Sequence, residues 1–92
     1  MKTPAEIKIQ IEALKKVRPK VRPYSVFGTD NLVQLDAQID VLENNLDSTD
    51  IFDKYGHSGI DEEVVPAALE ARQWIDGDSE FDDLASGYPL EE

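Results

Sequence analysis

Residues 32–46 read LVQLDAQIDVLENNL, and the spacing of the large apolar residues in this stretch decides the fold class. These residues recur at steps of three, four, three and four: Leu32, Leu35, Ile39, Leu42 and Leu46. Such spacing places them on one face of a helix as a heptad seam. A seam of two repeats is more typical of the centre of a helical bundle than of a dimeric coiled coil. We therefore expect one central helix, capped at its start by Thr29 or Asp30.

The other side chains of this helix divide into two groups. Val33 and Val41 flank the apolar seam. The polar residues are expected mainly on the remaining faces of the helix: Asp36, Gln38, Asp40 and Glu43.

A first helix is expected before it, over residues 4–17. Thr3 and Glu6 have the spacing of a capping box, with a proline at the first helical position. Pro19 ends the helix, because the residue before a proline avoids the α conformation. The apolar face comprises Ile7, Ile11 and Leu14, widened by Ile9 and Ala13.

Two further helices are expected after the central one. A short helix over about residues 49–55 would stop at Gly56, and a third main helix over about residues 61–76 would end at Gly77. Pro66 lies about one turn into this last helix, which permits either a kink or a start at that residue.

Residues 18–28 are expected to connect the first two helices by an extended path. Pro19 and Pro23 forbid a regular helix here, and the apolar residues favour an ordered connection with one short edge strand. Tyr24 and Phe27 are expected to be buried.

These elements predict an all-α fold: a small bundle of three main helices with an extended, proline-containing connection. Residues 1–77 form the expected single domain, and residues 78–92 form an acidic tail, docked or partly disordered. The tail carries apolar residues that a purely solvating segment would lack, so they either dock onto the bundle or bind a partner. They are Phe81, Leu84, Tyr88 and Leu90.

Composition excludes several classes of protein. The chain of 92 residues has no cysteine, so disulfides, thiol catalysis and cysteine-ligated zinc are ruled out. Its apolar runs are too short for a transmembrane helix, and no membrane partner is expected. His57 is the only histidine, and its neighbours in a glycine-flanked loop do not orient a catalytic triad. We expect a protein that is not an enzyme and needs no metal or cofactor.

A calcium-binding loop is the alternative that the sequence favours least. Asp53 and Asp61 have the spacing of the first and ninth positions of an EF-hand loop. Tyr55 and His57 then fall on the third and fifth positions, where oxygen ligands are needed, and Val64 replaces the final glutamate. We interpret the segment as an ordinary loop before an acidic helix start.

Charge is distributed unevenly along the chain, whose net charge is −11. Residues 1–23 carry seven bases and two acids, a net charge of +5, whereas residues 24–92 carry two bases and eighteen acids, a net charge of −16. Either the basic head folds back and neutralises the acidic body, or the two surfaces meet different partners.

Two sets of candidate contact residues follow from this asymmetry. Carboxylates presented as a DNA backbone presents phosphates would bind a basic protein surface: Asp36, Asp40, Glu43, Asp61, Glu62 and Glu63. A basic segment held extended by prolines would contact RNA or a second protein surface: Lys15, Lys16, Arg18, Lys20, Arg22 and Tyr24. The net acidity argues against binding free DNA.

Five segments resemble a family of small acidic proteins carried by bacteriophages and mobile elements. The matching residues begin with Lys2-Thr3-x-Ala5-Glu6-Ile7 and Leu14-Lys15, and continue with Arg22-x-x-Ser25-x-Phe27-Gly28-x-Asp30-Asn31. They end with Asp36-Ala37-Gln38-Ile39-x-Val41-Leu42-Glu43 and Ala68-Leu69-x-Ala71-Arg72-x-Trp74-x-Asp76-Gly77. The likeness covers about residues 1–77.

Some members of such phage sets resemble anti-CRISPR proteins that act on type I (I-F-like) surveillance complexes. The resemblance implies an inhibitor in the cytoplasm of a host bacterium that binds an RNA-guided complex and keeps target DNA off it. The alternative is a non-enzymatic adaptor or regulatory protein that docks a host protein through its acidic, aromatic tail.

Overall fold

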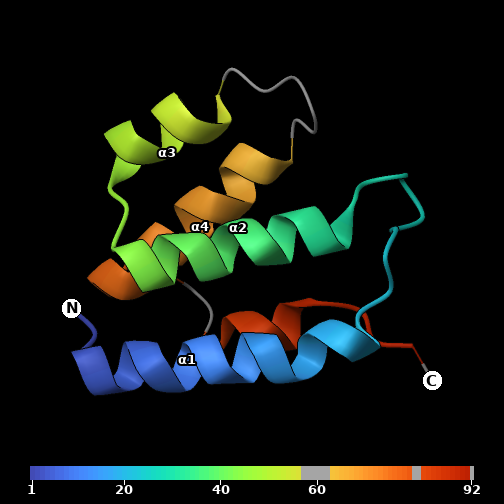
Figure 1. Ribbon diagram of the computed structural model, residues 1–92, viewed down its shortest axis with the longest axis horizontal. Coiled ribbons are helices and arrows are strands. Elements are labelled where there is room, and N and C mark those ends of the chain that lie inside the picture. Colours follow the sequence, from blue (N-terminus) through green and yellow to red (C-terminus); the bar gives the residue numbers. More distant parts are fainter. Residues whose placement is uncertain (57–62, 80–81, 92) are drawn as a thin grey trace.

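The structure is a computed structural model that describes residues 1–56, 63–79 and 82–91. Within these ranges the chain forms four α-helices: α1 (Pro4–Val17), α2 (Asn31–Asn44), α3 (Ser48–Tyr55) and α4 (Val64–Asp76). Two short 3₁₀ helices are η1 (Arg18–Lys20) and η2 (Leu84–Gly87). The expectation of a small all-α bundle is confirmed (Figure 1).

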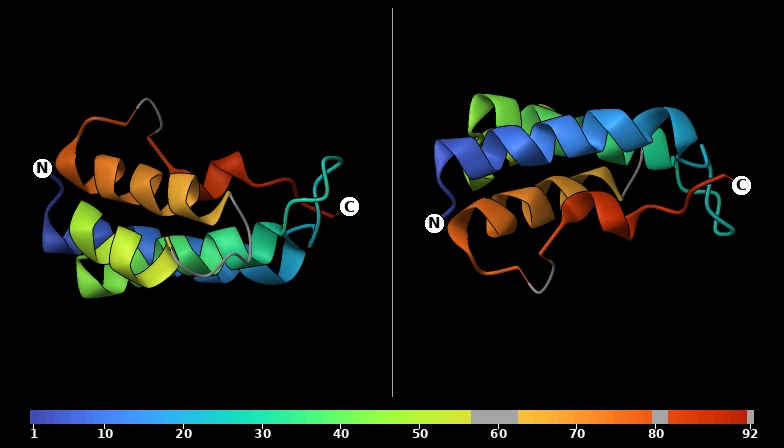
Figure 2. Two further views of the ribbon diagram at one scale, coloured as in Figure 1. Left: turned by 90° about the horizontal axis from the view of Figure 1, so that it is seen from above. Right: turned by 90° about the horizontal axis from the view of Figure 1, so that it is seen from below.

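The helices lie in two layers (Figure 2). One layer holds α1, α2 and α3, with α2 between the other two, and the second layer holds α4 and η2. α2 packs most extensively against α4, and next against α1. The central position expected for the 32–46 helix is therefore correct.

Local signals set three helix ends where the sequence predicted them, the starts of α1 and α2 and the end of α4. The Thr3 hydroxyl accepts a hydrogen bond from the Glu6 amide, and the Glu6 carboxylate accepts one from the Thr3 amide. The Asp30 carboxylate accepts from the amides of Leu32 and Val33, which caps α2. Gly77 ends α4 in the left-handed conformation, with φ of +85°.

The start of α4 differs from the expected residue 61. The helix begins at Val64, and the carbonyl of its N-cap residue Glu63 accepts from the Ala67 amide. Pro66 then lies in the first turn, where its missing N–H removes no helical hydrogen bond. Asp61 and Glu62 lie outside the described residues.

The buried face of α2 is wider than its apolar seam. Leu35, Leu42 and the flanking Val41 are buried, but so is Gln38, which was expected on an outer face. Gln38 Nε2 donates to the Ala67 carbonyl of α4 at 3.0 Å, so its amide is satisfied inside the core. On α1, Ile9 was expected to widen the buried apolar face, but its side chain is 66% exposed.

Residues from the acidic tail complete the core. Leu84 and Ala85 in η2 are buried in the same cluster as the helices, and Tyr88 packs against it. The Trp74 indole N–H donates to the Asp82 carbonyl at 3.2 Å. The hydrophobic core therefore continues past residue 77, the expected limit of the domain.

The connection between α1 and α2 is ordered, but its aromatic residues are not buried. Tyr24 is 63% exposed and Phe27 is 90% exposed, so the expectation of burial was wrong. Instead of an edge strand, the segment makes two isolated antiparallel bridges, Val21 with Leu90 and Tyr24 with Asp30. Pro19 stands in η1, because a short 3₁₀ turn accepts proline at its start.

Candidate interaction surfaces

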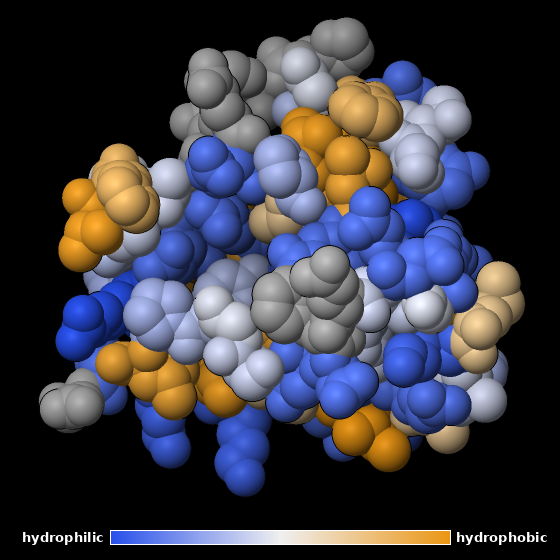
Figure 3. Space-filling model, turned by 180° about the vertical axis from the view of Figure 1, so that it is seen from behind, coloured by the Kyte–Doolittle hydropathy of each residue, from blue (hydrophilic) through white to orange (hydrophobic). Residues whose placement is uncertain are grey.

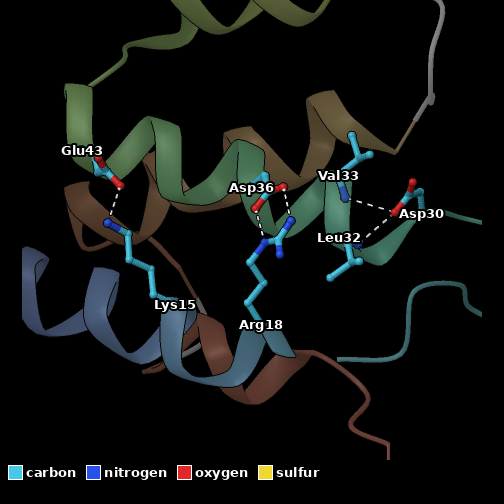
Figure 4. A network of polar contacts seen from close by, with 7 residues as sticks. All are labelled: Lys15, Arg18, Asp30, Leu32, Val33, Asp36 and Glu43. Carbon is cyan, nitrogen blue, oxygen red and sulfur yellow. Dashed lines mark hydrogen bonds and ion pairs between the residues drawn. The ribbon is translucent and has the colours of Figure 1, made fainter. Parts of the chain in front are cut away.

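The first candidate surface is the line of carboxylates along α2, and most of its charge is matched by the protein's own cations. Arg18 Nε and Nη2 donate to the two carboxylate oxygens of Asp36 at 2.8 and 3.1 Å. Lys15 Nζ lies 3.1 Å from Glu43 Oε1 (Figure 4). Both bases come from α1 and η1, so these contacts bridge the basic head to α2.

Asp40 is the third carboxylate of this line and the most heavily bonded. It accepts from Lys54 Nζ at 2.5 Å, from the Tyr55 hydroxyl at 2.7 Å and from Asn44 Nδ2 at 2.6 Å. Burial raises the pKa of the Asp40 carboxyl, but the hydrogen bonds from these donors outweigh burial and hold its pKa below the usual value. Burial, together with the hydrogen bond to Asp40, raises the pKa of the Tyr55 hydroxyl.

These pairs change the interpretation of the predicted sites. Asp36, Asp40 and Glu43 lie on one helix, but each faces a cation of this chain, so the line does not present three uncompensated charges. Of the predicted basic contacts, Lys15 and Arg18 are used internally. Three others make no ion pair within the described residues: Lys16, Lys20 and Arg22.

The backbone of residues 20–22 is fixed by the tail that runs beside it. The Arg22 amide donates to the Pro89 carbonyl at 2.9 Å, and the Glu91 amide donates to the Lys20 carbonyl at 2.6 Å. Because both bonds use main-chain atoms, the Lys20 and Arg22 side chains remain exposed. The backbone of Glu91 therefore lies beside that of Lys20.

An acidic edge of α3 was not among the predicted sites. It consists of three exposed aspartates three residues apart, Asp47, Asp50 and Asp53. Asp47 and Asp50 form a reciprocal capping box at the start of α3. The only base of this helix, Lys54, is held by Asp40 of α2. Figure 1 places α3 and the basic α1 on opposite sides of α2.

The predicted cluster at residues 61–63 is described only at Glu63. This residue is exposed and precedes α4 without capping it through its side chain. Half of the calcium-loop alternative, residues 57–62 of 53–64, lies outside the described part of the chain. Within the described ranges, no group of three or more histidines, aspartates and glutamates is placed to hold a metal ion.

A second feature that sequence reasoning missed is an apolar turn, residues 25–29. The Gly28 amide donates to the Ser25 carbonyl at 3.0 Å, which puts Val26 and Phe27 at the two central positions of the turn. Val26 is 92% exposed and Phe27 is 90% exposed. The signal was present in the sequence, since a glycine three residues after a serine is typical of a tight turn.

The turn projects from the end of the molecule where α1 leads into α2 (Figure 1). In Figure 3, seen from the opposite side, a small hydrophobic cluster stands out from the body at the corresponding edge. Gly28 has a φ of +80°, a conformation that glycine adopts without steric cost.

A polar hollow of about 250 Å³ opens between α2, α4 and η2. Its lining includes Gln38, Glu70 and Tyr88, and the Tyr88 hydroxyl donates to Gln38 Oε1 at 2.6 Å. Burial raises the pKa of the Glu70 carboxyl, and burial together with the nearby Glu70 charge raises the pKa of the Tyr88 hydroxyl. The hydrogen bond from Tyr88 to Gln38 thus joins the tail to the central helix α2 at this hollow.

Comparison with known proteins adds no assignment to these surfaces. The chain matches no protein-family model, no curated protein and no solved structure. Across the described ranges, no helix has the length and apolar content needed to cross a bilayer.

Proposed function

We propose that this protein is a non-enzymatic inhibitor of the anti-CRISPR type, carried by a bacteriophage or mobile element. It acts in the cytoplasm of a host bacterium on a type I (I-F-like) RNA-guided surveillance complex. Its acidic side occupies a basic protein surface that otherwise holds target DNA. The choice of target rests on the sequence resemblance, and the mode of binding rests on charge.

The observation that carries the binding mode is the separation of charge across the bundle. The acidic edge of α3 is exposed on one side, and the exposed bases Lys16, Lys20 and Arg22 belong to α1 and the connection that follows it. A surface of one sign steers association with a surface of the opposite sign. The α2 line contributes less, because Asp36, Asp40 and Glu43 already face bases of the same chain.

The adaptor alternative gains no comparable support. Leu84 is buried, and the Tyr88 hydroxyl is bonded to Gln38. Both side chains would have to leave the bundle before they could dock a host protein.

A purified type I-F-like complex, loaded with guide RNA, provides the test. Binding of a fluorescent double-stranded target is followed by anisotropy while the protein is titrated in. Target binding should fall as the protein saturates the complex, and the inhibition should weaken as salt rises. Unchanged target binding at a large excess of protein would refute the proposal.

A pair of variants with the same change in net charge locates the surface. Asp53→Lys reverses an exposed charge on α3 without removing a cap, whereas Glu12→Lys makes the same reversal on α1. Asp53→Lys should slow association with the complex, and Glu12→Lys should not. Equal effects would show that net charge, rather than the α3 edge, governs binding.

A further inference from the structure

We infer that the apolar turn at residues 25–29 is a second, hydrophobic contact that inserts Val26 and Phe27 into an apolar pocket on a protein subunit of the same complex. The inference rests on the proposed function for the identity of the complex. Its own basis is the shape and rigidity of the turn and the positive charge near its base.

Exposure of this kind is unusual in a chain with a small core. Burying a valine or phenylalanine side chain removes apolar surface from water and stabilises a fold. Here two such side chains are adjacent and almost fully exposed at the tip of a projection, and Tyr24 is largely exposed near its base. Adjacent exposed apolar groups of this type mark interaction sites more often than single ones do.

The turn is held in one shape before it meets a partner. Ser25 Oγ accepts from the amides of Phe27 at 3.2 Å and Thr29 at 3.3 Å, and lies 2.5 Å from the Thr29 hydroxyl oxygen. The Ser25 amide donates to the Thr29 carbonyl at 3.0 Å. Because these bonds already order the loop, little conformational entropy is lost when it docks.

The base of the turn is anchored to the bundle as well. Asn31 is buried, and its side-chain Nδ2 donates to the Arg22 carbonyl at 2.9 Å. Its backbone N–H donates to the Pro23 carbonyl at 2.9 Å. Val26 and Phe27 are therefore carried on a rigid stalk, which suits insertion into a concave site.

Charge indicates the chemistry of that site. Lys20 and Arg22 are exposed near the base of the turn and make no ion pair within the described part of the chain. A pocket that is apolar at its bottom and lined with carboxylates at its rim would match both features.

Two other occupants fit less well. An RNA strand would stack on Phe27, but Val26 offers no ring beside it at the tip of the turn. A second copy offers an apolar hollow of about 440 Å³ at the start of α1, but two lysines line it, Lys2 and Lys8, against one glutamate, Glu43. Glu43 is already paired with Lys15, so the described residues of this hollow lack the free carboxylates that the bases near the turn would favour.

Binding kinetics of the guide-loaded type I-F-like complex test the inference with a matched control. Phe27→Ser and Ile9→Ser each remove a large exposed apolar side chain, and both should leave the thermal melt unchanged. Phe27→Ser should raise the dissociation rate roughly thirtyfold, the loss expected of an interface hot spot, while the association rate stays the same. Ile9→Ser should change neither rate.

Ser25→Ala tests the role of rigidity, since it keeps Val26 and Phe27 but removes the Oγ acceptor. It should weaken binding less than Phe27→Ser does. If the wild-type protein binds and Phe27→Ser matches Ile9→Ser, the inference is wrong and the proposed function stands. If the wild-type protein does not bind the complex, both fail.

Photocrosslinking identifies the occupant. Benzoylphenylalanine in place of Phe27 should crosslink to a protein subunit of the complex. A crosslink to the guide RNA, a crosslink to a second copy of this chain, or no crosslink in the bound state would each overturn the assignment.

Discussion

Ionisation of the Glu70 carboxyl opposes folding. Its pKa is raised by burial beside the polar hollow, so the folded chain favours the neutral carboxyl. A raised carboxyl pKa means that ionisation lowers stability at neutral pH; this loss shrinks as the pH falls below the folded-state pKa and is gone below the unfolded-state pKa.

Glu70→Gln should therefore raise the melting temperature at pH 7. The gain should vanish at pH 3.5, where the glutamate is protonated in both folded and unfolded chains. Thermal melts of both proteins across this range provide the measurement. A gain that persists at pH 3.5 would show that packing of the amide, rather than loss of the charge, is responsible.

Tyr88 controls whether the buried Gln38 amide is satisfied. Tyr88→Phe removes the hydroxyl that donates to Gln38 Oε1 and leaves that oxygen without its donor in the core. The free energy of unfolding should fall by about 1–3 kcal/mol, as measured by urea denaturation. In a Gln38→Met background the same substitution should cost much less, because no acceptor is left unpaired. Equal losses in the two backgrounds would mean that the hydrogen bond contributes nothing.

At the level of elements, the bases of residues 15–22 form two sets. Lys15 and Arg18 tie α1 and η1 to α2, whereas the second set makes no ion pair within the described residues: Lys16, Lys20 and Arg22. The structure thus assigns internal neutralisation to the first set and leaves the second set exposed.

Two double variants test the roles of these two sets of bases separately. Lys15→Ala with Arg18→Ala should lower the melting temperature slightly, because exposed pairs contribute little stability. Lys20→Ala with Arg22→Ala should leave the melt unchanged and reduce affinity for the guide-loaded complex. A lower melt for the second variant would show that these bases also neutralise the acidic body.

Helix ends were predictable because their signals are local. Thr3 with Glu6, Asp30, and Gly77 each act within four residues, and each lies where the sequence predicted it. The burial predicted for Phe27 was wrong because the turn between Ser25 and Gly28 holds this hydrophobic side chain out in solvent.

Contacts between residues far apart in the sequence could not be predicted from the sequence. The burial of Gln38 depends on Ala67 and Tyr88, which lie 29 and 50 residues away along the chain. Nor does helical periodicity reveal that Lys15 reaches Glu43, because that contact depends on how α1 packs against α2. The heptad seam identified the central helix but not the full width of its buried face.

At the scale of the whole molecule, stability depends on residues that follow the last α-helix. A chain of residues 1–77 keeps all four α-helices but lacks Leu84, Ala85 and Tyr88. It should lose about 3–5 kcal/mol of stability from the apolar area no longer covered, and melt at a lower temperature with a broader transition. Leu90→Ser in the full chain is the control, since Leu90 is 43% exposed and should tolerate the change. A truncated chain that melts like the full one would place the domain boundary at residue 77.

The position of η2 also sets the order of events during synthesis. A ribosome makes α1, α2, α3 and α4 before it adds Leu84 and Ala85, so the surface of α1 against which η2 packs stays bare in the growing polypeptide. At about 5–20 residues per second this interval is short, but any pause after Gly77 prolongs it and exposes apolar surface to chaperones and proteases. Nascent chains stalled with residue 77 outside the ribosome should be cut by protease more readily than chains stalled after residue 91. Equal resistance would show that the helices protect themselves before the final turn arrives.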